Sequence, residues 1–390
     1  MLINIVVGGT FHFPMLANHL INQGHDVRVY TSTPKFKIKN KKIRKICRFI
    51  PMPVQIFRKI TGFTSHPVLK YIDSLLFDFI VSLLMRDCDL LYGFATSSLR
   101  CGKKVKANKG VYVLDRACPH VIFQEEVMNY EYEKLELKKG IQPNSYLNRA
   151  LNEYTIADYI CVPSLYTKKT FIDNDIASNK LLLTPLEATF SLPKPKKFKI
   201  NNKNLTIGVV GSGFVRKGYI YLFEAVSKLS LFNVELIVLA NETELRSCKK
   251  IRQLLNINKN IRILGYMSNI NTFYDSCDIF CLPSVDEGFG MVIMEALSHS
   301  LPIITTSNVG ASTYVKNKIN GFVIKPRDVD GLIKKIKFFY FDRNKIMMYG
   351  KNSYTEYKQF LKKQLYKVSI EKVISLTSMK LEARNIKNKK

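Results

Sequence analysis

The stretch Leu205-Thr-Ile-Gly-Val-Val-Gly-Ser-Gly213 joins a short apolar run to a pair of glycines, and a helical pattern follows it from about Lys217 to Leu229. A short apolar run that ends in glycine and leads into a helix is typical of a buried strand followed by a tight turn. The apolar run Val234-Glu-Leu-Ile-Val-Leu239 is then predicted to be the next strand. The whole stretch predicts a strand–turn–helix–strand unit with parallel strands.

The same unit occurs at the start of the chain. The run Leu2-Ile-Asn-Ile-Val-Val7 ends in Gly8-Gly9, a helical pattern covers residues 13–23, and His25-Asp-Val-Arg-Val-Tyr30 alternates as a second strand. Two such openings predict an α/β protein in which two Rossmann-like domains face each other across a cleft. The length of 390 residues agrees with this, because a single core rarely serves more than about 250–300 residues.

Further apolar runs extend both predicted sheets. We predict strands at 90–93, 111–115 and 159–163 in the first half and at 261–264, 279–282, 303–306 and 322–324 in the second. The segment 191–203 is rich in proline and lysine, has no periodicity and is predicted to be a linker. The predicted parts are a first domain of residues 1–190, a second domain of residues 204–355, and C-terminal helices at 356–390 that pack back toward the first domain and end in a basic tail.

The charge of the chain is strongly positive. Sixty Lys and Arg residues against 31 Asp and Glu residues give a net charge of +29, which favours an anionic partner. A membrane surface, a polyanionic polymer and nucleic acid all satisfy this requirement. The longest apolar run, Leu75 to Met85, contains Asp78 and is shorter than the about 20 apolar residues of a membrane span.

The cysteines and the N-terminus predict a cytoplasmic location. The eight cysteines show no paired Cys-x-x-Cys spacing, and most lie in apolar runs, so we expect them to be small core side chains in a reducing compartment. No basic stretch precedes the first apolar run at Leu2, so the N-terminus does not resemble a signal peptide.

The segment from Glu287 to Glu295 carries two carboxylates at helical spacing. The sequence is Glu287-Gly-Phe-Gly-Met-Val-Ile-Met-Glu295, and a predicted strand that ends at Pro283-Ser284 precedes it. Eight helical steps of 100° bring the two glutamates to within about 80° of each other, so both can face one side. Such a pair suits two separate hydroxyl-bearing groups on one extended ligand.

This segment resembles the glutamate-x-seven-glutamate motif of retaining glycosyltransferases with the GT-B fold, most closely those of family 4. The resemblance is close over residues 205–337 and loose over the first half of the chain. It implies that Glu295 binds the ribose hydroxyls of the donor nucleotide and that Glu287 lies beside the donor sugar. It also places three neighbours of Glu287 and one residue of the base-binding loop in the donor site, namely Gly288, Phe289, Gly290 and Tyr266.

The turn after the strand at 205–210 carries two adjacent cations. A glycine turn lets the backbone approach a phosphate, and Arg216 and Lys217 can neutralise its charge. The stretch from Gly211 to Gly218 resembles the glycine-turn motif of the same family, in the Arg-Lys-Gly form of lipopolysaccharide-core glucosyltransferases. The resemblance implies that Arg216 and Lys217 bind the donor diphosphate and stabilise the charge on the leaving group.

The first domain contributes Gly9 and His120 to the predicted site. The resemblance places the turn at Gly9 next to the donor diphosphate and the acceptor, and His12 follows that turn closely. Related enzymes carry a histidine near the donor sugar after the strand that corresponds to 111–115. His120 is offset from that position, so Asp115 or Arg116 is an alternative for part of the role. The predicted catalytic residues are His120, Arg216, Lys217 and Glu287.

One segment departs from the family pattern, and the aspartate triplets of the chain bear on whether it binds a metal. The segment from Val309 to Tyr314 lacks the glutamate that the family often carries there. Three Asp-x-Asp triplets occur, but none follows a suitable strand, so we expect no metal and no cofactor besides the nucleotide-sugar substrate.

A basic segment begins at Lys35 and continues to Lys59, mixing cations with isoleucine and phenylalanine. Such a segment can lie on an anionic leaflet, with its apolar side chains adding burial that salt does not screen. A solvated loop and a face for a polyanionic acceptor are the alternatives.

Taken together, the residues and the family resemblance that they carry favour a retaining glycosyltransferase that uses a nucleotide-diphosphate sugar, with UDP as the favoured nucleotide. We expect its acceptor to be a glycan or a lipid-linked glycan in polysaccharide or glycolipid synthesis at the cytoplasmic face of a membrane. A nucleotide-sugar epimerase or a phosphorylase of similar architecture remains an alternative, as does a basic nucleic-acid-binding protein. Their usual motifs are not found, and we expect no nucleic-acid partner.

Overall fold

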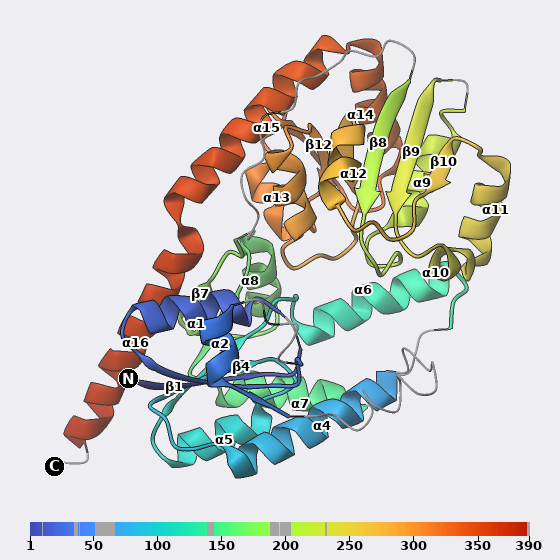
Figure 1. The fold of residues 1–390 in the computed structure, drawn as a ribbon. Helices are drawn as coiled ribbons and strands as arrows, with labels where there is room; N and C mark the ends of the chain where they lie inside the picture. The colour runs from blue at the N-terminus through green and yellow to red at the C-terminus, as the bar shows by residue number, and fades with distance from the viewer. Residues whose placement is uncertain are drawn as a thin grey trace.

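The computed structural model describes residues 1–387 apart from 10, 35–37, 39, 51–66, 139–143, 188–194, 196–203 and 231. Two α/β domains lie one above the other, and a long C-terminal helical segment runs along one side of both (Figure 1). The predicted linker, except for residue 195, and much of the predicted basic segment lie outside the described residues.

The first domain is built on a seven-stranded sheet in the order β3-β2-β1-β4-β5-β6-β7, in which neighbouring strands pair in parallel. Its strands are β1 (Leu2–Val7), β2 (Asp26–Thr31), β3 (Cys47–Phe49), β4 (Leu90–Phe94), β5 (Val111–Asp115), β6 (Tyr159–Val162) and β7 (Leu181–Leu183). Its helices are α1 (Phe13–Asn22), α2 (Lys41–Ile46), α4 (Pro67–Leu84), α5 (Leu99–Ala107), α6 (Val121–Lys134), α7 (Asn144–Ile156) and α8 (Leu165–Ile172), with a short 3₁₀ turn η2 (Ser178–Lys180). One apolar cluster packs α1 and α2 on the sheet, and another packs α4, α5 and α7 on it.

The second domain is built on a six-stranded sheet in the order β10-β9-β8-β11-β12-β13, again with parallel neighbours. Its strands are β8 (Leu205–Val210), β9 (Val234–Leu239), β10 (Ile261–Ile263), β11 (Ile279–Leu282), β12 (Ile303–Thr306) and β13 (Gly321–Ile324). Its helices are α9 (Tyr219–Ser227), α10 (Glu242–Arg246), α11 (Lys249–Ile257), α12 (Ile270–Ser276), α13 (Met291–Ser298), η3 (Gly310–Tyr314) and α14 (Val329–Phe341). The chain ends in α15 (Asn344–Lys363) and α16 (Leu365–Lys387).

The predicted strands are confirmed to within a residue at their ends, and two further strands were not predicted. Both unpredicted strands, β3 and β7, are three residues long and lie at the two edges of the first sheet. Three residues give little alternation for sequence reasoning to detect, although β10, of the same length, was predicted.

Each sheet has one point at which the order of its strands reverses. In the first sheet β1 lies between β2 and β4, and in the second β8 lies between β9 and β11. The loops that follow the two central strands diverge there, and ligands of open parallel sheets bind in the crevice between them. We call the loops after β1 and β4 the first switch point, and the loops after β8 and β11 the second switch point.

The C-terminal helix α16 packs on the first domain. Tyr366, Ile370 and Val373 join the apolar cluster on the face of α1. The Asp158 carboxylate lies 2.8 Å from Lys380 Nζ and 3.0 Å from an Arg384 nitrogen. These contacts hold α16 on the first domain. Helix α15 continues across residue 355, where the second domain was predicted to end.

The two domains also contact each other through α6. Leu135, just after α6, is buried in the core of the second domain. The Glu131 carboxylate, at 0% exposure, accepts a hydrogen bond of 2.8 Å from the Tyr221 hydroxyl and pairs with Arg327 Nε at 2.5 Å. Among the described residues, no helix has the length and apolar character that crossing a membrane requires.

Candidate functional site

The loop after β8 brings a lysine across a glycine. Gly211 has a φ of +125°, and a Cβ on this residue would lie 2.4 Å from Lys217 Cε. The positive φ favours glycine at this position, and the lysine side chain lies across it. The Tyr219 hydroxyl donates to the Gly211 carbonyl at 2.9 Å and fixes the turn from its other end.

Three of the predicted site residues form one ionic cluster at the second switch point. Arg216 Nη1 lies 2.9 Å from Glu287 Oε1, and Lys217 Nζ lies 3.0 Å from Glu287 Oε2. Burial alone would raise the pKa of Glu287, but Lys217 and Arg216 outweigh burial and hold it below its usual range. Glu287 is therefore an ionised carboxylate between two cations that come from the other loop of the switch point.

Glu295 lies on α13 with its carboxylate against a tyrosine. The Tyr274 hydroxyl donates to Glu295 Oε2 at 2.5 Å, and only 9% of Glu295 is exposed. Burial raises the pKa of Glu295, while Tyr274 and Lys217 act in the opposite direction. Lys217 thus acts to lower the pKa of both glutamates, which agrees with the prediction that the two face one side.

The loop between the two glutamates lies directly against the first domain. Ser164 Oγ and Thr167 Oγ1 donate to the Gly288 carbonyl at 2.6 Å and 3.0 Å. A Cβ on Gly288 would lie 2.0 Å from the Ala117 carbonyl oxygen. Glycine is required at this position because the loop after β5 approaches its backbone so closely. Phe289 is 3% exposed, and Gly290, at a φ of +89°, is the residue before α13.

Asp286 is a residue of this site that sequence reasoning missed. Its carboxylate accepts hydrogen bonds from the Tyr166 hydroxyl at 2.7 Å and from Gln124 Nε2 at 3.0 Å, both in the first domain. Its carbonyl accepts one from Arg216 Nη1 at 3.1 Å. The only sequence signal was its position next to Glu287. Asp286 joins the contact between the domains to the ionic cluster.

His120 does not lie where the sequence predicted. It is 1% exposed, and its ring packs between Tyr154 and Phe171 at centroid distances of 5.1 Å. Burial, helped by Arg116, lowers the pKa of His120 to about 4, and its ring nitrogens have no hydrogen-bond partner among the described residues. The backbone of His120 precedes α6 and donates to Thr170 Oγ1, which turns the ring into the core of the first domain. The expected position at the edge of the cleft is therefore corrected.

A different histidine occupies the corresponding sheet edge. His12 Nε2 lies 2.9 Å from Asp115 Oδ2 at the end of β5, and the Tyr92 hydroxyl donates to the same oxygen at 2.9 Å. Gly9 lies in the same loop as His12, before α1. Tyr266 follows β10 and is 93% exposed, so its side chain is available to a ligand. Within the described residues, no group of three or more His, Cys, Asp or Glu side chains gathers to hold a metal.

Comparisons with known proteins match mainly the second domain, which carries the ionic cluster. Residues 192–356 match the family model of the Glycosyl transferases group 1. Similar curated proteins include the capsular polysaccharide biosynthesis glycosyltransferase CapM of Staphylococcus aureus, 28% identical over 52% of this chain and 58% of that protein. Another is the UDP-Gal:alpha-D-GlcNAc-diphosphoundecaprenol alpha-1,3-galactosyltransferase of Escherichia coli, 28% identical over 45% of this chain and 47% of that protein. The chain spans about half the length of the curated relatives it matches.

Solved structures share the fold over nearly the whole chain. A sucrose-phosphate synthase of Thermosynechococcus elongatus has a TM-score of 0.71 at 16% identity and covers 98% of this chain and 100% of that one. The Anabaena protein HepE, solved in complex with UDP, has a TM-score of 0.66 at 16% identity and covers 97% and 100%. The two sheets form the GT-B fold of glycosyltransferases. The second domain, which carries the ionic cluster, lies within the residues that match the Glycosyl transferases group 1, and neither the epimerase nor the nucleic-acid alternative is favoured.

Proposed function

We propose that the protein transfers a sugar, with retention of configuration, from a UDP-sugar to a glycan or lipid-linked acceptor. The observation that carries the proposal is the cluster of Arg216, Lys217 and Glu287 at the second switch point. A diphosphate needs cations, and Arg216 and Lys217 lie beside backbone that a glycine turn opens. The UDP complex of Anabaena HepE and the UDP-Gal in the name of the Escherichia coli relative support the choice of nucleotide.

The geometry suggests how the residues divide the work. In the absence of donor, Glu287 balances the charge of Arg216 and Lys217. When a donor diphosphate approaches, both cations can turn to it, and Glu287 is left beside the sugar. Glu295, on α13, accepts from Tyr274 through Oε2 and has a second oxygen for a ribose hydroxyl. Two hydroxyl-binding carboxylates thus flank the cations.

The transfer step needs no further charged partner. The bond between the anomeric carbon and the diphosphate oxygen breaks with its electron pair on that oxygen, where Arg216 and Lys217 stabilise the charge. The acceptor hydroxyl oxygen forms the new bond to the same face of that carbon, and its proton passes to the departing diphosphate. Because the two cations supply the positive charge, we propose that activity persists in EDTA.

A thermal-shift screen of the full chain against UDP-, GDP- and ADP-sugars tests the donor assignment. A ligand at 100 times its dissociation constant stabilises a folded protein by about 2.7 kcal/mol, so we expect UDP-sugars to raise the melting temperature by a few degrees. The Lys217→Ala variant serves as the comparison and should show a smaller shift. A wild-type chain that no nucleotide sugar stabilises would contradict the proposal.

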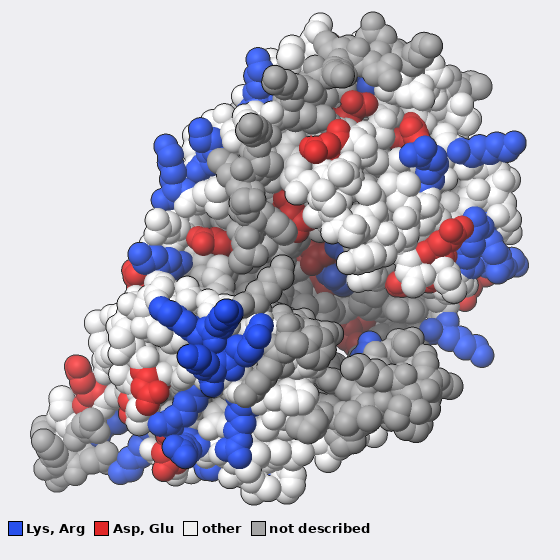
Figure 2. Space-filling view, viewed as in Figure 1, with Lys and Arg blue, Asp and Glu red and all other residues white. Residues whose placement is uncertain are grey.

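We further propose that the protein binds an anionic membrane surface through α2. Lysine and arginine side chains gather over α1 and α2 in the space-filling view (Figure 2). Lys41, Lys42 and Lys45 are exposed, while the Arg44 guanidinium donates to the Ile38 carbonyl. Each cation near an anionic leaflet contributes about 1 kcal/mol.

The structure corrects one expectation about this surface. Three isoleucines of the segment predicted to meet the membrane face the protein instead, because Ile38, Ile43 and Ile50 are 3%, 0% and 4% exposed. Phe49 remains 37% exposed. Binding to the described part of the segment should therefore be mainly electrostatic, and salt should remove most of it.

Co-sedimentation with vesicles tests this surface. Vesicles with an anionic lipid should bind the chain at low salt and release most of it at 0.15 M ionic strength, where the Debye length is about 8 Å. Replacing Lys41, Lys42 and Lys45 with glutamine should weaken vesicle binding and leave nucleotide binding unchanged. Equal binding to neutral and anionic vesicles would contradict the proposal.

A further inference from the structure

Tyr274 reaches Glu295 from α12 and has a fixed ring. It is fully buried, and its hydroxyl donates to Glu295 Oε2 at 2.5 Å. Its ring stacks on His299 at a centroid distance of 4.9 Å, with the two planes 29° apart. Phe273 and Phe280 pack against the same ring at 5.4 Å and 5.7 Å. Close-packed aromatic rings leave a buried side chain little freedom, so the hydroxyl is directed at Glu295 before a ligand arrives.

Helix α12 is in turn held against the central strand of the second sheet. A Cβ on Gly208 of β8 would lie 2.3 Å from Sγ of Cys277, the residue after α12. The absence of a side chain at Gly208 therefore allows the end of α12 to lie close on β8. The loop that follows β8 carries Lys217. The positions of Tyr274 and Lys217 relative to Glu295 are thus set within the second domain.

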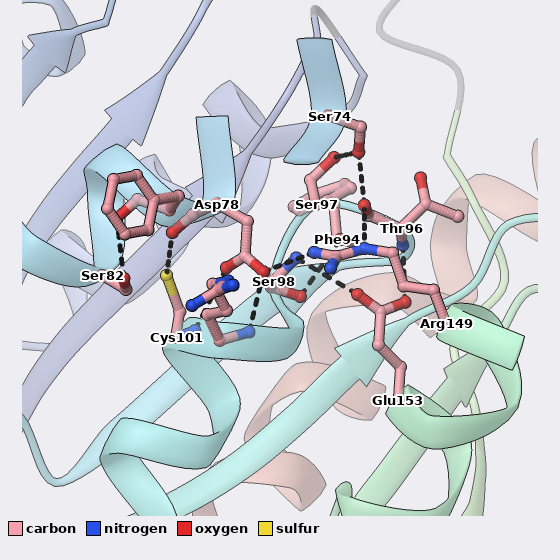
Figure 3. A network of polar contacts seen from close by, with 12 residues as sticks. Ser74, Asp78, Ser82, Phe94, Thr96, Ser97, Ser98, Cys101, Arg149 and Glu153 are labelled. Carbon is pink, nitrogen blue, oxygen red and sulfur yellow. Dashed lines mark hydrogen bonds and ion pairs between the residues drawn. The ribbon is translucent and has the colours of Figure 1, made fainter. Parts of the chain in front are cut away.

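One oxygen of Glu295 is left open, unlike those of the carboxylate that holds the loop after β4. That carboxylate, Glu153, is shown in Figure 3 and accepts from the backbone N–H groups of Thr96 at 2.6 Å through Oε2 and of Ser98 at 3.2 Å through Oε1. Glu295 accepts through Oε2, its Oε1 has no hydrogen bond among the described residues, and 9% of the residue is exposed. Buried polar atoms are normally hydrogen-bonded, so Oε1 is the atom that a ligand can use.

The groups around Glu295 act on its charge from several elements. Burial raises the pKa of Glu295, and the Tyr274 hydroxyl is the strongest opposing influence, ahead of Lys217. Burial, and after it Glu295, raise the pKa of Tyr357 on α15. His299, at the end of α13, has its Nδ1 atom 2.9 Å from the Glu295 carbonyl oxygen. Burial, and after it Glu295, also raise the pKa of Tyr274 well above its usual range, so its hydroxyl keeps its proton and remains a donor.

We propose that Tyr274 is a positioning residue of the donor site, whose hydroxyl holds Oε2 of Glu295 and leaves Oε1 for the ribose of the nucleotide. The inference rests on the proposed function, because it names the group that orients the ribose-binding carboxylate. Once the donor diphosphate has drawn Lys217 to itself, Tyr274 is the neighbour that still favours the charged form of Glu295. A charged acceptor binds a hydroxyl about twice as strongly as a neutral one. Loss of the Tyr274 hydroxyl should therefore weaken nucleotide binding, and more so as the pH falls.

Calorimetry of UDP binding to the full chain, repeated between about pH 8 and about pH 5.5, tests the proposal with Tyr274→Phe. The variant removes one oxygen and should raise the dissociation constant about threefold at the upper end of this range. Without the hydroxyl, Glu295 has a higher pKa and takes up a proton first as the pH falls. The ratio of the two dissociation constants should therefore grow by at least a further factor of about three at the lower end. UDP itself titrates in this range, but its titration affects both proteins equally and leaves the ratio unchanged.

Two further variants separate positioning from packing. Tyr357→Phe is the matched control, because Tyr357 is equally buried in the same apolar cluster and its hydroxyl has no hydrogen-bond partner among the described residues. It should leave the dissociation constant within about twofold of the wild type at every pH. In a chain that carries Glu295→Ala there is no carboxylate to position, so the addition of Tyr274→Phe should change UDP affinity less than about twofold.

A wild type that binds UDP and a Tyr274→Phe variant that binds it equally well would overturn the inference and leave the proposed function standing. A ratio that does not change with pH, an equal loss in Tyr357→Phe, or a loss that persists in the Glu295→Ala chain would also overturn it, because each points to packing. A wild type that binds no UDP would contradict the proposed donor and the inference together.

A second variant covers the case in which Tyr274→Phe does not fold. Phe280→Leu removes a ring that packs on Tyr274 and introduces no titratable group. It loosens the tyrosine without removing the hydroxyl, so it should give a smaller loss of UDP affinity that again grows as the pH falls. An unchanged affinity in Phe280→Leu would then count against the proposal.

Discussion

The two switch points have the same topology and carry different side chains. In both, a central parallel strand ends in a glycine-containing loop beside a second loop from the strand next to it. At the second switch point that loop pair holds Arg216, Lys217 and Glu287 in ionic contact. At the first, the loop pair contributes Phe11 and Ser97 to a pocket that Lys70 and Asp73 on α4 also line. The two sheets thus place their loops in the same way, and the residues of the loops and neighbouring helices give each switch point its own chemistry.

The two loop pairs are also held in different ways. The ionic cluster of the second is made by its own two loops, and Asp286 ties it to Tyr166 and Gln124 of the other domain. The loop after β4 in the first is fixed entirely from within its own domain by Glu153 and Arg149. We infer that the donor site responds to the position of the domains, whereas the pocket of the first domain keeps its shape regardless of that position.

The largest expected effect is that of Lys217→Ala on turnover. Charge on the leaving group is greatest in the transition state, so loss of this cation should lower kcat by about 10²–10³-fold, as loss of a single stabilising donor does in other enzymes. Steady-state kinetics should show a much smaller change in KM for the donor. Lys228→Ala is the control, because its side chain is 62% exposed on the end of α9. A loss of donor affinity with unchanged kcat would contradict the role.

Next in size is the effect of Glu295→Ala on nucleotide affinity. A hydrogen bond to a charged group contributes about 1.5–3 kcal/mol, so the dissociation constant for UDP should rise roughly 10- to 100-fold in calorimetry. Glu136→Ala, at a side chain that is 70% exposed, should leave it unchanged. An unchanged dissociation constant for UDP in Glu295→Ala would contradict the proposed contact between the ribose and Glu295.

A smaller effect is expected from Asp286→Asn. The amide keeps the size of the side chain but loses the charge that Tyr166 and Gln124 bind. We expect the variant to lose about 1 kcal/mol of the coupling between the domain contact and the ionic cluster. This loss should lower kcat about fivefold and leave UDP affinity unchanged. Tyr166→Phe should give a similar change, and the double variant should lose less than the sum of both. Strict additivity would show that the two side chains act independently.

The smallest effect on either ligand is expected from Asp158→Asn, which should instead lower stability by about 1–3 kcal/mol at neutral pH. Burial would raise the pKa of Asp158, but hydrogen bonds from Lys106 and Lys380 outweigh burial and lower it. A lowered carboxyl pKa gives stability that is present above the unfolded value, about 3.9, and is lost as the pH falls through the folded value. Urea unfolding should therefore separate the two proteins at pH 7 and bring them together below pH 4. A constant difference at all pH values would contradict the ionic clamp on α16.

The sequence was sufficient where the site is made of short contiguous segments. The glycine turn before Lys217 and the pair Glu287 and Glu295 each lie within one loop or one loop and its helix. Spacing therefore predicts which side chains lie near one another, while their predicted roles come from the family resemblance. The contacts that sequence reasoning missed join residues far apart in the chain, such as Tyr166 with Asp286, separated by 120 positions. No periodicity records such a pairing.

Side-chain direction was the second limit. The sequence correctly places His120 after the strand at 111–115, but it does not tell which way the ring points. Packing against Tyr154 and Phe171 turns the ring into the core. In the same way, the mixture of cations and isoleucine around α2 indicates an amphipathic segment without telling which surface the apolar side meets. The structure shows that Ile43 packs on the first sheet. An apolar side chain can be buried in the protein core or in a membrane, and here it is buried in the core.

Calorimetry of UDP binding to the full chain tests the central claim most directly. Three proteins are compared: the wild type, the double variant Arg216→Ala/Lys217→Ala at the second switch point, and Ser97→Ala at the first. The account predicts equal affinities for the wild type and Ser97→Ala, and binding at least tenfold weaker in the double variant. Undiminished UDP binding by a folded double variant, or a comparable loss in Ser97→Ala, would contradict the assignment of the nucleotide to the second switch point.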